Sequence, residues 1–118
     1  MNADYFSKVR ILDGGMGQTL LKKGLKAKGS LWSATALIEE KYHQLVIDTH
    51  LDFIKSGADV IVTNNFSARR SRTLQNNVNK HFNYANQKAG EFALKAKEVS
   101  KKNILIAGSL PAQYDTYV

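Results

Sequence analysis

The 118-residue sequence has no cysteine, a single proline and no apolar run long enough for a transmembrane helix. The absence of cysteine excludes disulfide bonds, a thiolate nucleophile and cysteine-bound zinc within this chain. The N-terminal residues also lack the apolar core of a secretory signal. We therefore expect a cytoplasmic protein that does not enter a membrane and that is stabilised by packing.

Negative charge is also scarce, with 10 Asp+Glu against 17 Lys+Arg and a net charge of +7. Such an excess is compatible with nucleic-acid binding. However, the lysines are spread among polar residues, which is typical of solvated helix faces. Only Arg69, Arg70 and Arg72 cluster, and no aromatic residues alternate with them as base-stacking platforms. We expect no nucleic-acid partner, and a basic nucleic-acid-binding domain centred on these arginines stays as an alternative.

The chain length and a composition of 43% hydrophobic and 23% charged residues suit one globular domain. Short β-branched runs predict strands near residues 9–12, 60–63 and 104–107. The second and third runs are almost continuously apolar, as in strands that are buried on both faces. Each run is followed by small or polar residues, which predicts a loop.

Helical patterns separate these runs. Apolar residues recur at steps of three and four over residues 33–56, and Gly57 then predicts a left-handed helix end. A second apolar stripe predicts a helix over residues 83–101, whereas residues 73–78 give only a weak helical pattern. The alternation of strands and helices predicts an α/β fold with parallel strands and right-handed crossovers.

Three parallel strands with two crossovers leave both outer strands with an open edge. A closed barrel of eight such units needs about 250 residues. We therefore interpret residues 1–118 as a single partial domain. The open edges also allow a different interpretation, in which the chain is a noncatalytic α/β interaction module that associates with itself.

The first loop is rich in glycine. In parallel α/β folds, ligands gather at the carboxyl ends of the strands, where Asp13, Gly14 and Gly15 would lie. Glycines allow positive φ and close approach of a ligand, their N–H groups suit a carboxylate, and Asp13 suits an ammonium group. This combination indicates an amino-acid ligand, although a plain strand-to-helix turn has the same spacing. A dinucleotide fingerprint is excluded because its third glycine would fall on Leu20.

The second loop is rich in asparagine. Thr63, Asn64, Asn65 and Phe66 follow the second run, and their amide and hydroxyl groups could orient a polar ligand or close a turn. Trp32 lies in the long connection after the first run. It either lines a pocket or anchors that connection.

No catalytic or metal-binding residue is predicted. Ser109, in the third loop, has no histidine partner nearby in the sequence. His43, His50 and His81 match no metal-binding spacing.

Four segments together resemble the homocysteine S-methyltransferase family, whose members are zinc-dependent barrels that methylate homocysteine to methionine. They are residues 11–17, 31–34, 57–66 and 106–109. The resemblance implies a TIM (β/α)8 barrel of which this chain is the N-terminal portion, with the first three βα units. It also implies a role in methionine biosynthesis.

The same resemblance implies a set of substrate-binding residues. Those matching the family's first-strand loop would hold the amino-acid end of homocysteine, namely Asp13, Gly14 and Gly15. Thr63 would contact the same end, and the neighbouring residues that shape the pocket would be Asn64, Asn65 and Phe66. Trp32, from its own position in the sequence, completes the set of candidate substrate-binding residues. Ser67 stands where a betaine-using branch has tyrosine, which argues against betaine. The methyl donor stays open among S-methylmethionine, S-adenosylmethionine, betaine and a methylated folate or cobalamin.

The zinc of the family is held by three cysteines on later strands, and this chain has none. The resemblance therefore implies a segment that contributes the substrate cradle and that is inactive alone. Its expected partners are homocysteine and a methyl donor, both bound by the complete enzyme.

Overall fold

The computed structural model describes residues 3–112, which form a mixed α/β fold that is mostly helical. Its α-helices are α1 (Met16–Lys22), α2 (Thr35–Ile38), α3 (His43–Lys55), α4 (Arg70–Gln75) and α5 (Phe82–Ser100). Its strands are β1 (Val60–Val62) and β2 (Leu105–Ala107). The 3-10 helices are η1 (Ala3–Ser7), η2 (Gly29–Ala34), η3 (Glu40–Tyr42) and η4 (Asn79–His81). None of the helices within residues 3–112 is both long and apolar enough to span a bilayer.

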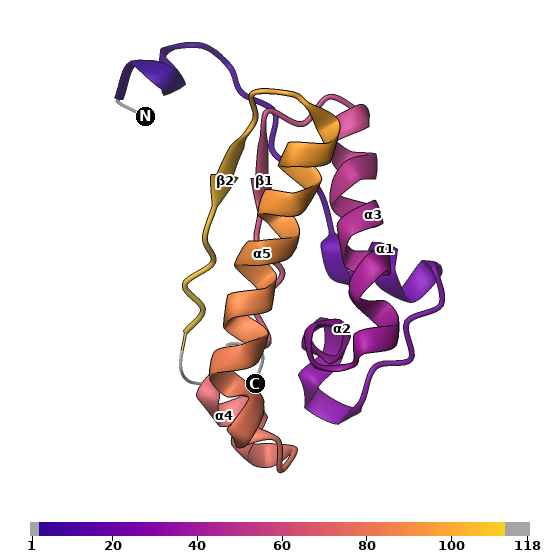
Figure 1. The fold of residues 1–118 in the computed structure, drawn as a ribbon. Coiled ribbons are helices and arrows are strands. Elements are labelled where there is room, and N and C mark those ends of the chain that lie inside the picture. Colours follow the sequence, from indigo (N-terminus) through magenta and orange to yellow (C-terminus); the bar gives the residue numbers. More distant parts are fainter. Residues whose placement is uncertain (1–2, 113–118) are drawn as a thin grey trace.

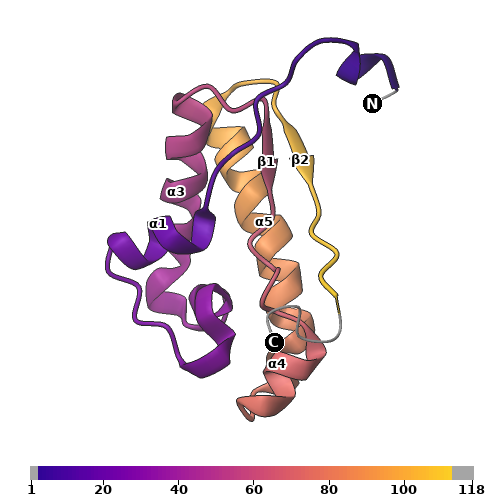
Figure 2. The same ribbon diagram turned by 180° about the vertical axis from the view of Figure 1, so that it is seen from behind.

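The two strands pair in parallel, with Val60 opposite Leu105 and Val62 opposite Ala107. The Thr63 amide continues the ladder by donating to the Ala107 carbonyl at 3.0 Å. Helix α5 makes the crossover between the strands and lies beside α3 along the same face of the sheet (Figures 1 and 2). The predicted strands near 60–63 and 104–107 are thus confirmed, each one residue shorter.

The predicted strand near residues 9–12 is wrong in its extent. Only Leu12 forms a parallel bridge, to Val60, and the segment lies beside β1 on the side away from β2 (Figure 2). The Ile11 carbonyl accepts from the Asp59 and Val60 amides, but the Ile11 amide donates to the Asp59 side chain, Oδ2, at 2.8 Å. Because a carboxylate takes the place of a strand carbonyl, the ladder ends there.

The single helix predicted over residues 33–56 is also wrong, because the segment is divided. Glu39 has extended backbone angles (φ −89°, ψ 113°) between α2 and η3, so only α3 is a long helix. Gly57 ends α3 with φ +108°, which confirms the predicted positive-φ helix end. Helix α5 confirms the helix over 83–101, and α4 begins three residues before the weak pattern at 73–78.

The core lies between α3, α5 and the elements on either side of them. Buried alanines on α5 allow α3 to approach closely: Ala85, Ala89, Ala93 and Ala96. Towards the α1 and α2 end the core contains Leu20, Leu37 and Val46, and towards the sheet it contains Ile54 and Ile61. This packing fixes the strands and so positions the loops at their carboxyl ends.

Candidate functional site

A cavity of about 650 Å³ lies at the carboxyl ends of the first segment and β1. One wall is residues 13–18, which form the glycine-rich loop and the start of α1. The other lining residues are Trp32 and Ser33 of η2, Ser109 after β2, and a set from the end of β1 and the segment after it: Val62, Thr63, Asn64, Phe66, Ser67, Arg69 and Arg72. All but one of the predicted substrate-binding residues line this cavity: Asp13, Gly14, Gly15, Trp32, Thr63, Asn64 and Phe66.

Asp13 is half-buried at the base of the glycine-rich wall. Its Oδ2 accepts a hydrogen bond from the Val62 amide at 2.9 Å, and its own amide donates to the Val60 carbonyl at 3.0 Å. Burial raises the pKa of the Asp13 carboxyl above its ordinary value, and the Val62 amide partly opposes this rise. The side chain is therefore fixed to β1 and stands where an ammonium group would relieve its desolvation.

The glycines of this wall are needed for close packing. A Cβ on Gly17 would lie 2.8 Å from ring carbons of Trp32, and a Cβ on Gly14 would lie 3.1 Å from the Phe53 ring. The described glycines with positive φ are Gly24, Gly29 and Gly57, so the freedom expected for Gly14 and Gly15 is not used. The sequence suggested that these glycines serve either positive φ or close approach. In the structure they allow the Trp32 and Phe53 rings to approach the loop closely.

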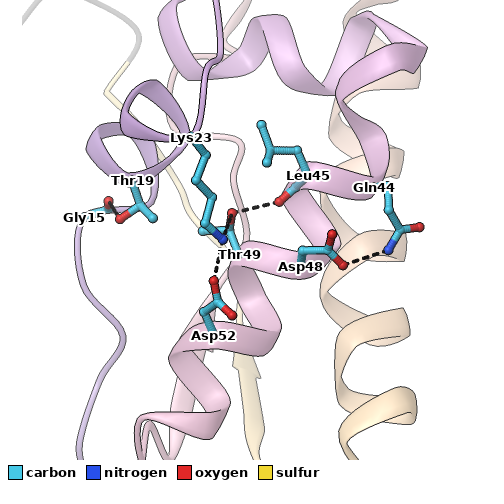
Figure 3. Close-up of polar contacts among 8 residues, drawn as sticks. All are labelled: Gly15, Thr19, Lys23, Gln44, Leu45, Asp48, Thr49 and Asp52. Carbon is cyan, nitrogen blue, oxygen red and sulfur yellow. Dashed lines mark hydrogen bonds and ion pairs between the residues drawn. The ribbon is translucent and has the colours of Figure 1, made fainter.

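The first turn of α1 is tied back to the loop, because Thr19 Oγ1 donates to the Gly15 carbonyl at 2.9 Å. At the other end of α1, Lys23 reaches α3 and contacts Thr49 and Asp52 (Figure 3). The helix that carries the glycine-rich wall is thus attached to α3 by an ion pair and a hydrogen bond.

Thr63 is held by a chain of side-chain hydrogen bonds. Its Oγ1 donates to Asn65 Oδ1 at 2.7 Å and accepts from the Ser109 amide at 3.1 Å. Asn65 Nδ2 donates to Asn86 Oδ1 on α5 and to the Ser109 carbonyl. Asn65 is the predicted site residue that does not line the cavity; it orients Thr63 and closes the turn.

Asn64 and Ser67 connect the same loop to η2. Asn64 is 5% exposed, and its Nδ2 donates to the Ser33 carbonyl at 3.3 Å. The hydroxyls of Ser67 and Ser33 lie 3.1 Å apart in a hydrogen bond. Phe66, in contrast, is 44% exposed at the cavity wall.

Two of the three clustered arginines that would centre a nucleic-acid site, Arg69 and Arg72, line the cavity instead. Arg69 is 2% exposed and donates from Nη1 to the Ala112 carbonyl, and Arg72 donates from Nη1 to the Ser30 carbonyl at 2.6 Å. Arg70 alone is exposed, 4.1 Å from the centre of the Phe82 ring. The three therefore do not form one basic surface. Their position in the loop and helix that follow a parallel strand is the signal that could have placed them at the cavity.

Trp32 combines the two roles that the sequence left open. The residue lines the cavity and is 38% exposed, its ring packs against Gly17, and its backbone has φ 47° and ψ −122°. It thus lines the pocket and anchors the connection between α1 and α2.

The donor set does not fit the thiolate-bound zinc that the resemblance implies. The sequence has no cysteine, and within residues 3–112 no group of three or more His, Cys, Asp or Glu side chains could hold a metal ion. We derive no step through zinc for this chain.

The family model described as homocysteine S-methyltransferase matches residues 10–118. The chain belongs to this family. Homocysteine S-methyltransferase 2 of Zea mays is 31% identical over 113 residues, which cover 92% of this chain and 31% of that protein. Homocysteine S-methyltransferase of Escherichia coli is 35% identical over 60 residues, which cover 51% of this chain and 19% of that protein.

Among solved structures, the metallated form of the homocysteine methyltransferase MmuM from Escherichia coli is similar, with a TM-score of 0.76 and 28% identity. The match covers 92% of this chain and 40% of that one. The family inferred from four sequence segments is therefore confirmed. The chain spans about a third of the length of its maize relative, at 31%.

Proposed function

We propose that the chain is the N-terminal part of a (β/α)8 barrel in a homocysteine S-methyltransferase, and that its cavity holds the amino-acid end of homocysteine. Family membership supports the substrate class. The observation that carries the proposal is that Asp13, the glycine-rich loop and Thr63 line a single cavity at the carboxyl ends of parallel segments.

The hydrogen-bond directions at Thr63 support a specific arrangement. Asn65 Nδ2 already donates to two acceptors, so its Oδ1 faces Thr63 and takes the only hydroxyl proton of that residue. A hydroxyl has two acceptor lone pairs, and the Ser109 amide uses one of them. Towards a ligand, Thr63 can therefore only accept. With the Asp13 carboxylate it presents two acceptors, which suit the ammonium group of an amino acid.

The carboxylate of the ligand would then face the backbone amides of the glycine-rich loop. Of the three glycines, Gly15 is the one with no ring against the position of a Cβ. Methyl transfer to the thiol, and the zinc that binds this thiol in the family, we assign to the rest of the barrel. On this proposal the chain contributes binding and orientation to a cytoplasmic reaction that forms methionine.

The test is isothermal titration calorimetry of the chain with L-homocysteine, before and after Asp13→Asn. This substitution keeps an acceptor for the Val62 amide and removes the charge. We expect binding to weaken by about 1.5–3 kcal/mol, as for a hydrogen bond to a charged group. Asp48→Asn, on the exposed side of α3, is the matched control and should leave the dissociation constant unchanged. Equal dissociation constants for Asp13→Asn and the parent would show that Asp13 does not contact homocysteine.

A self-associating interaction module is the second candidate, because apolar side chains are exposed along the first segment. Val9 is 95% exposed and Leu12 is 60% exposed, and among residues 3–112 no strand covers their edge. Light scattering after size-exclusion chromatography distinguishes the two. A stable dimer that does not bind homocysteine would favour the module, and a monomer that binds homocysteine would exclude it.

A further inference from the structure

The backbone of Trp32 is in an unfavourable conformation. A positive φ of 47° in a bulky residue costs about 1–3 kcal/mol, so the surrounding structure must hold it in place. The ring that this conformation directs towards Gly17 forms part of the cavity wall. The contacts on either side of Trp32 show what holds it.

On the N-terminal side, three side chains from the end of α4 converge on Ser30. Arg72 Nη1 donates to the Ser30 carbonyl at 2.6 Å, and Asn76 Nδ2 donates to Ser30 Oγ at 2.8 Å. Ser30 Oγ in turn donates to Gln75 Oε1 at 2.9 Å. The carbonyl and the hydroxyl of Ser30 are therefore both hydrogen-bonded to side chains at the end of α4 or just after it.

The adjacent Gly29 explains why this approach is so close. Gly29 has φ +52°, and a Cβ at this position would lie 2.6 Å from Asn76 Oδ1. Only glycine allows both the backbone angle and the short distance. On the C-terminal side of Trp32, Ser33 is held by Asn64 and Ser67, as described above.

We propose that Arg72, Gln75 and Asn76 form a clamp on Ser30 that positions Trp32 against the glycine-rich wall of the cavity. The clamp makes α4 a determinant of the cavity's shape. Arg72 and its neighbours are positioning residues, which act through the Ser30 backbone and hydroxyl. The consequence for ligand affinity rests on the proposed homocysteine function, whereas the position of Trp32 does not.

Trp32 is the only tryptophan in the sequence, so its fluorescence reports the clamp directly. The test compares Arg72→Met with Arg70→Met by acrylamide quenching. Arg70 is on the same helix but contacts Phe82 and Asn79 instead of Ser30. If Trp32 goes from 38% exposed to largely exposed in Arg72→Met, the quenching constant should rise about twofold. Arg70→Met should match the parent.

An unchanged quenching constant in a folded Arg72→Met variant, judged by its far-UV circular dichroism, would overturn the clamp. Arg72→Lys restores one donor to the Ser30 carbonyl and should bring the constant part of the way back. If Arg72→Met does not fold, Ser30→Ala decides, because it removes only the bonds to Gln75 and Asn76. Increased quenching in Ser30→Ala supports the clamp and parental quenching contradicts it.

Titration of the same proteins with L-homocysteine separates the clamp from the proposed function. If the parent does not bind homocysteine but Arg72→Met releases Trp32, the clamp stands and the function fails. If the parent binds homocysteine but Trp32 does not move in Arg72→Met, the clamp alone fails. If both hold, Arg72→Met should also raise the dissociation constant.

Discussion

The two walls of the cavity differ in the interactions that hold them. Apart from the Asp13 carboxylate, residues 13–18 are fixed by backbone bonds and by rings packed against glycines, whereas residues 63–67 are fixed mainly by a network of side-chain hydrogen bonds. Added side-chain atoms at the glycines of the first wall would clash with neighbouring rings. Loss of polar side chains from the second wall would leave hydrogen-bond partners unpaired. Substitutions in the two walls should therefore fail for opposite reasons.

The largest effect that we expect lies outside both walls, at His50 on α3. This side chain is fully buried, and neither ring nitrogen has a hydrogen-bond partner among residues 3–112. Burial lowers the pKa of His50 from 6.5 to about 4. Between pH 6.5 and pH 4, His50 is therefore protonated in the unfolded chain but neutral in the folded chain. The free energy of unfolding is highest above pH 6.5 and falls as the pH drops towards 4.

The loss from His50 alone approaches about 3 kcal/mol near pH 4. Urea unfolding at pH 7 and pH 4.5 measures it, and His50→Leu should lose less stability over this range than the parent does. Equal losses would show that His50 is not neutral and desolvated in the folded chain. The variant also provides a background in which the two walls can be compared at low pH.

We expect the next largest effect from Asn86→Ala, which removes the α5 partner of the asparagine-rich wall, residues 63–67. Asn86 on α5 accepts from Asn65 and donates to the Ala68 and Phe82 carbonyls. Loss of these bonds should lower the free energy of unfolding by about 1–3 kcal/mol, because polar partners are left behind. Chemical denaturation measures the change, with exposed Asn83→Ala on the same helix as the control. A variant as stable as that control would show that the network does not hold this wall.

In the glycine-rich wall, residues 13–18, the corresponding test adds a side-chain atom instead of removing polar ones. Gly17→Ala places a methyl group against the Trp32 ring, and overpacking of this kind costs about 1–3 kcal/mol. Because alanine also favours the helix by about 1 kcal/mol, we expect a net loss of about 1 kcal/mol and an altered Trp32 emission. Gly90→Ala, where nothing lies within 4 Å of the added carbon, should instead stabilise the chain. If both variants are stabilised, the close approach of Trp32 to Gly17 is not needed.

The smallest effect should come from Lys23→Met, which removes the contact of α1 with Thr49 and Asp52 (Figure 3). The Asp52 side chain is 58% exposed, and such pairs contribute less than about 1 kcal/mol. Lys22→Met is the neighbouring control, and thermal unfolding compares the two. A much larger loss in Lys23→Met alone would mean that the ion pair, and not packing, holds the glycine-rich wall.

The sequence correctly predicted the elements in which the apolar residues of the sequence pattern are also the ones that pack against a neighbouring element. β1 and β2 are apolar runs that are covered by α5, and α5 has one continuous apolar stripe. The break at Glu39 was missed because apolar residues keep their helical spacing on both sides of it. Residues 9–12 look like a strand, but the Asp59 carboxylate replaces a ladder partner there, and no local pattern reports this contact.

For the site, the sequence predicted the loops and the structure adds their connections. The roles of Asn65 and Arg72 depend on partners far along the chain, at Ser109 and Ser30. The burial of Arg69 is an exception for arginine, and its described contacts include the Ala112 carbonyl and the Phe66 ring, which no local pattern reports. Long-range polar contacts are therefore the part of the site that composition and spacing could not provide.

The most direct test of the homocysteine cradle is the perturbation of backbone amide NMR signals by L-homocysteine in the ¹⁵N-labelled chain. We expect saturable shifts for Asp13, Gly14, Gly15 and Thr63, and none for Ser100 at the far end of α5. Saturable shifts confined to residues outside the cavity, or no shifts at all, would contradict the account.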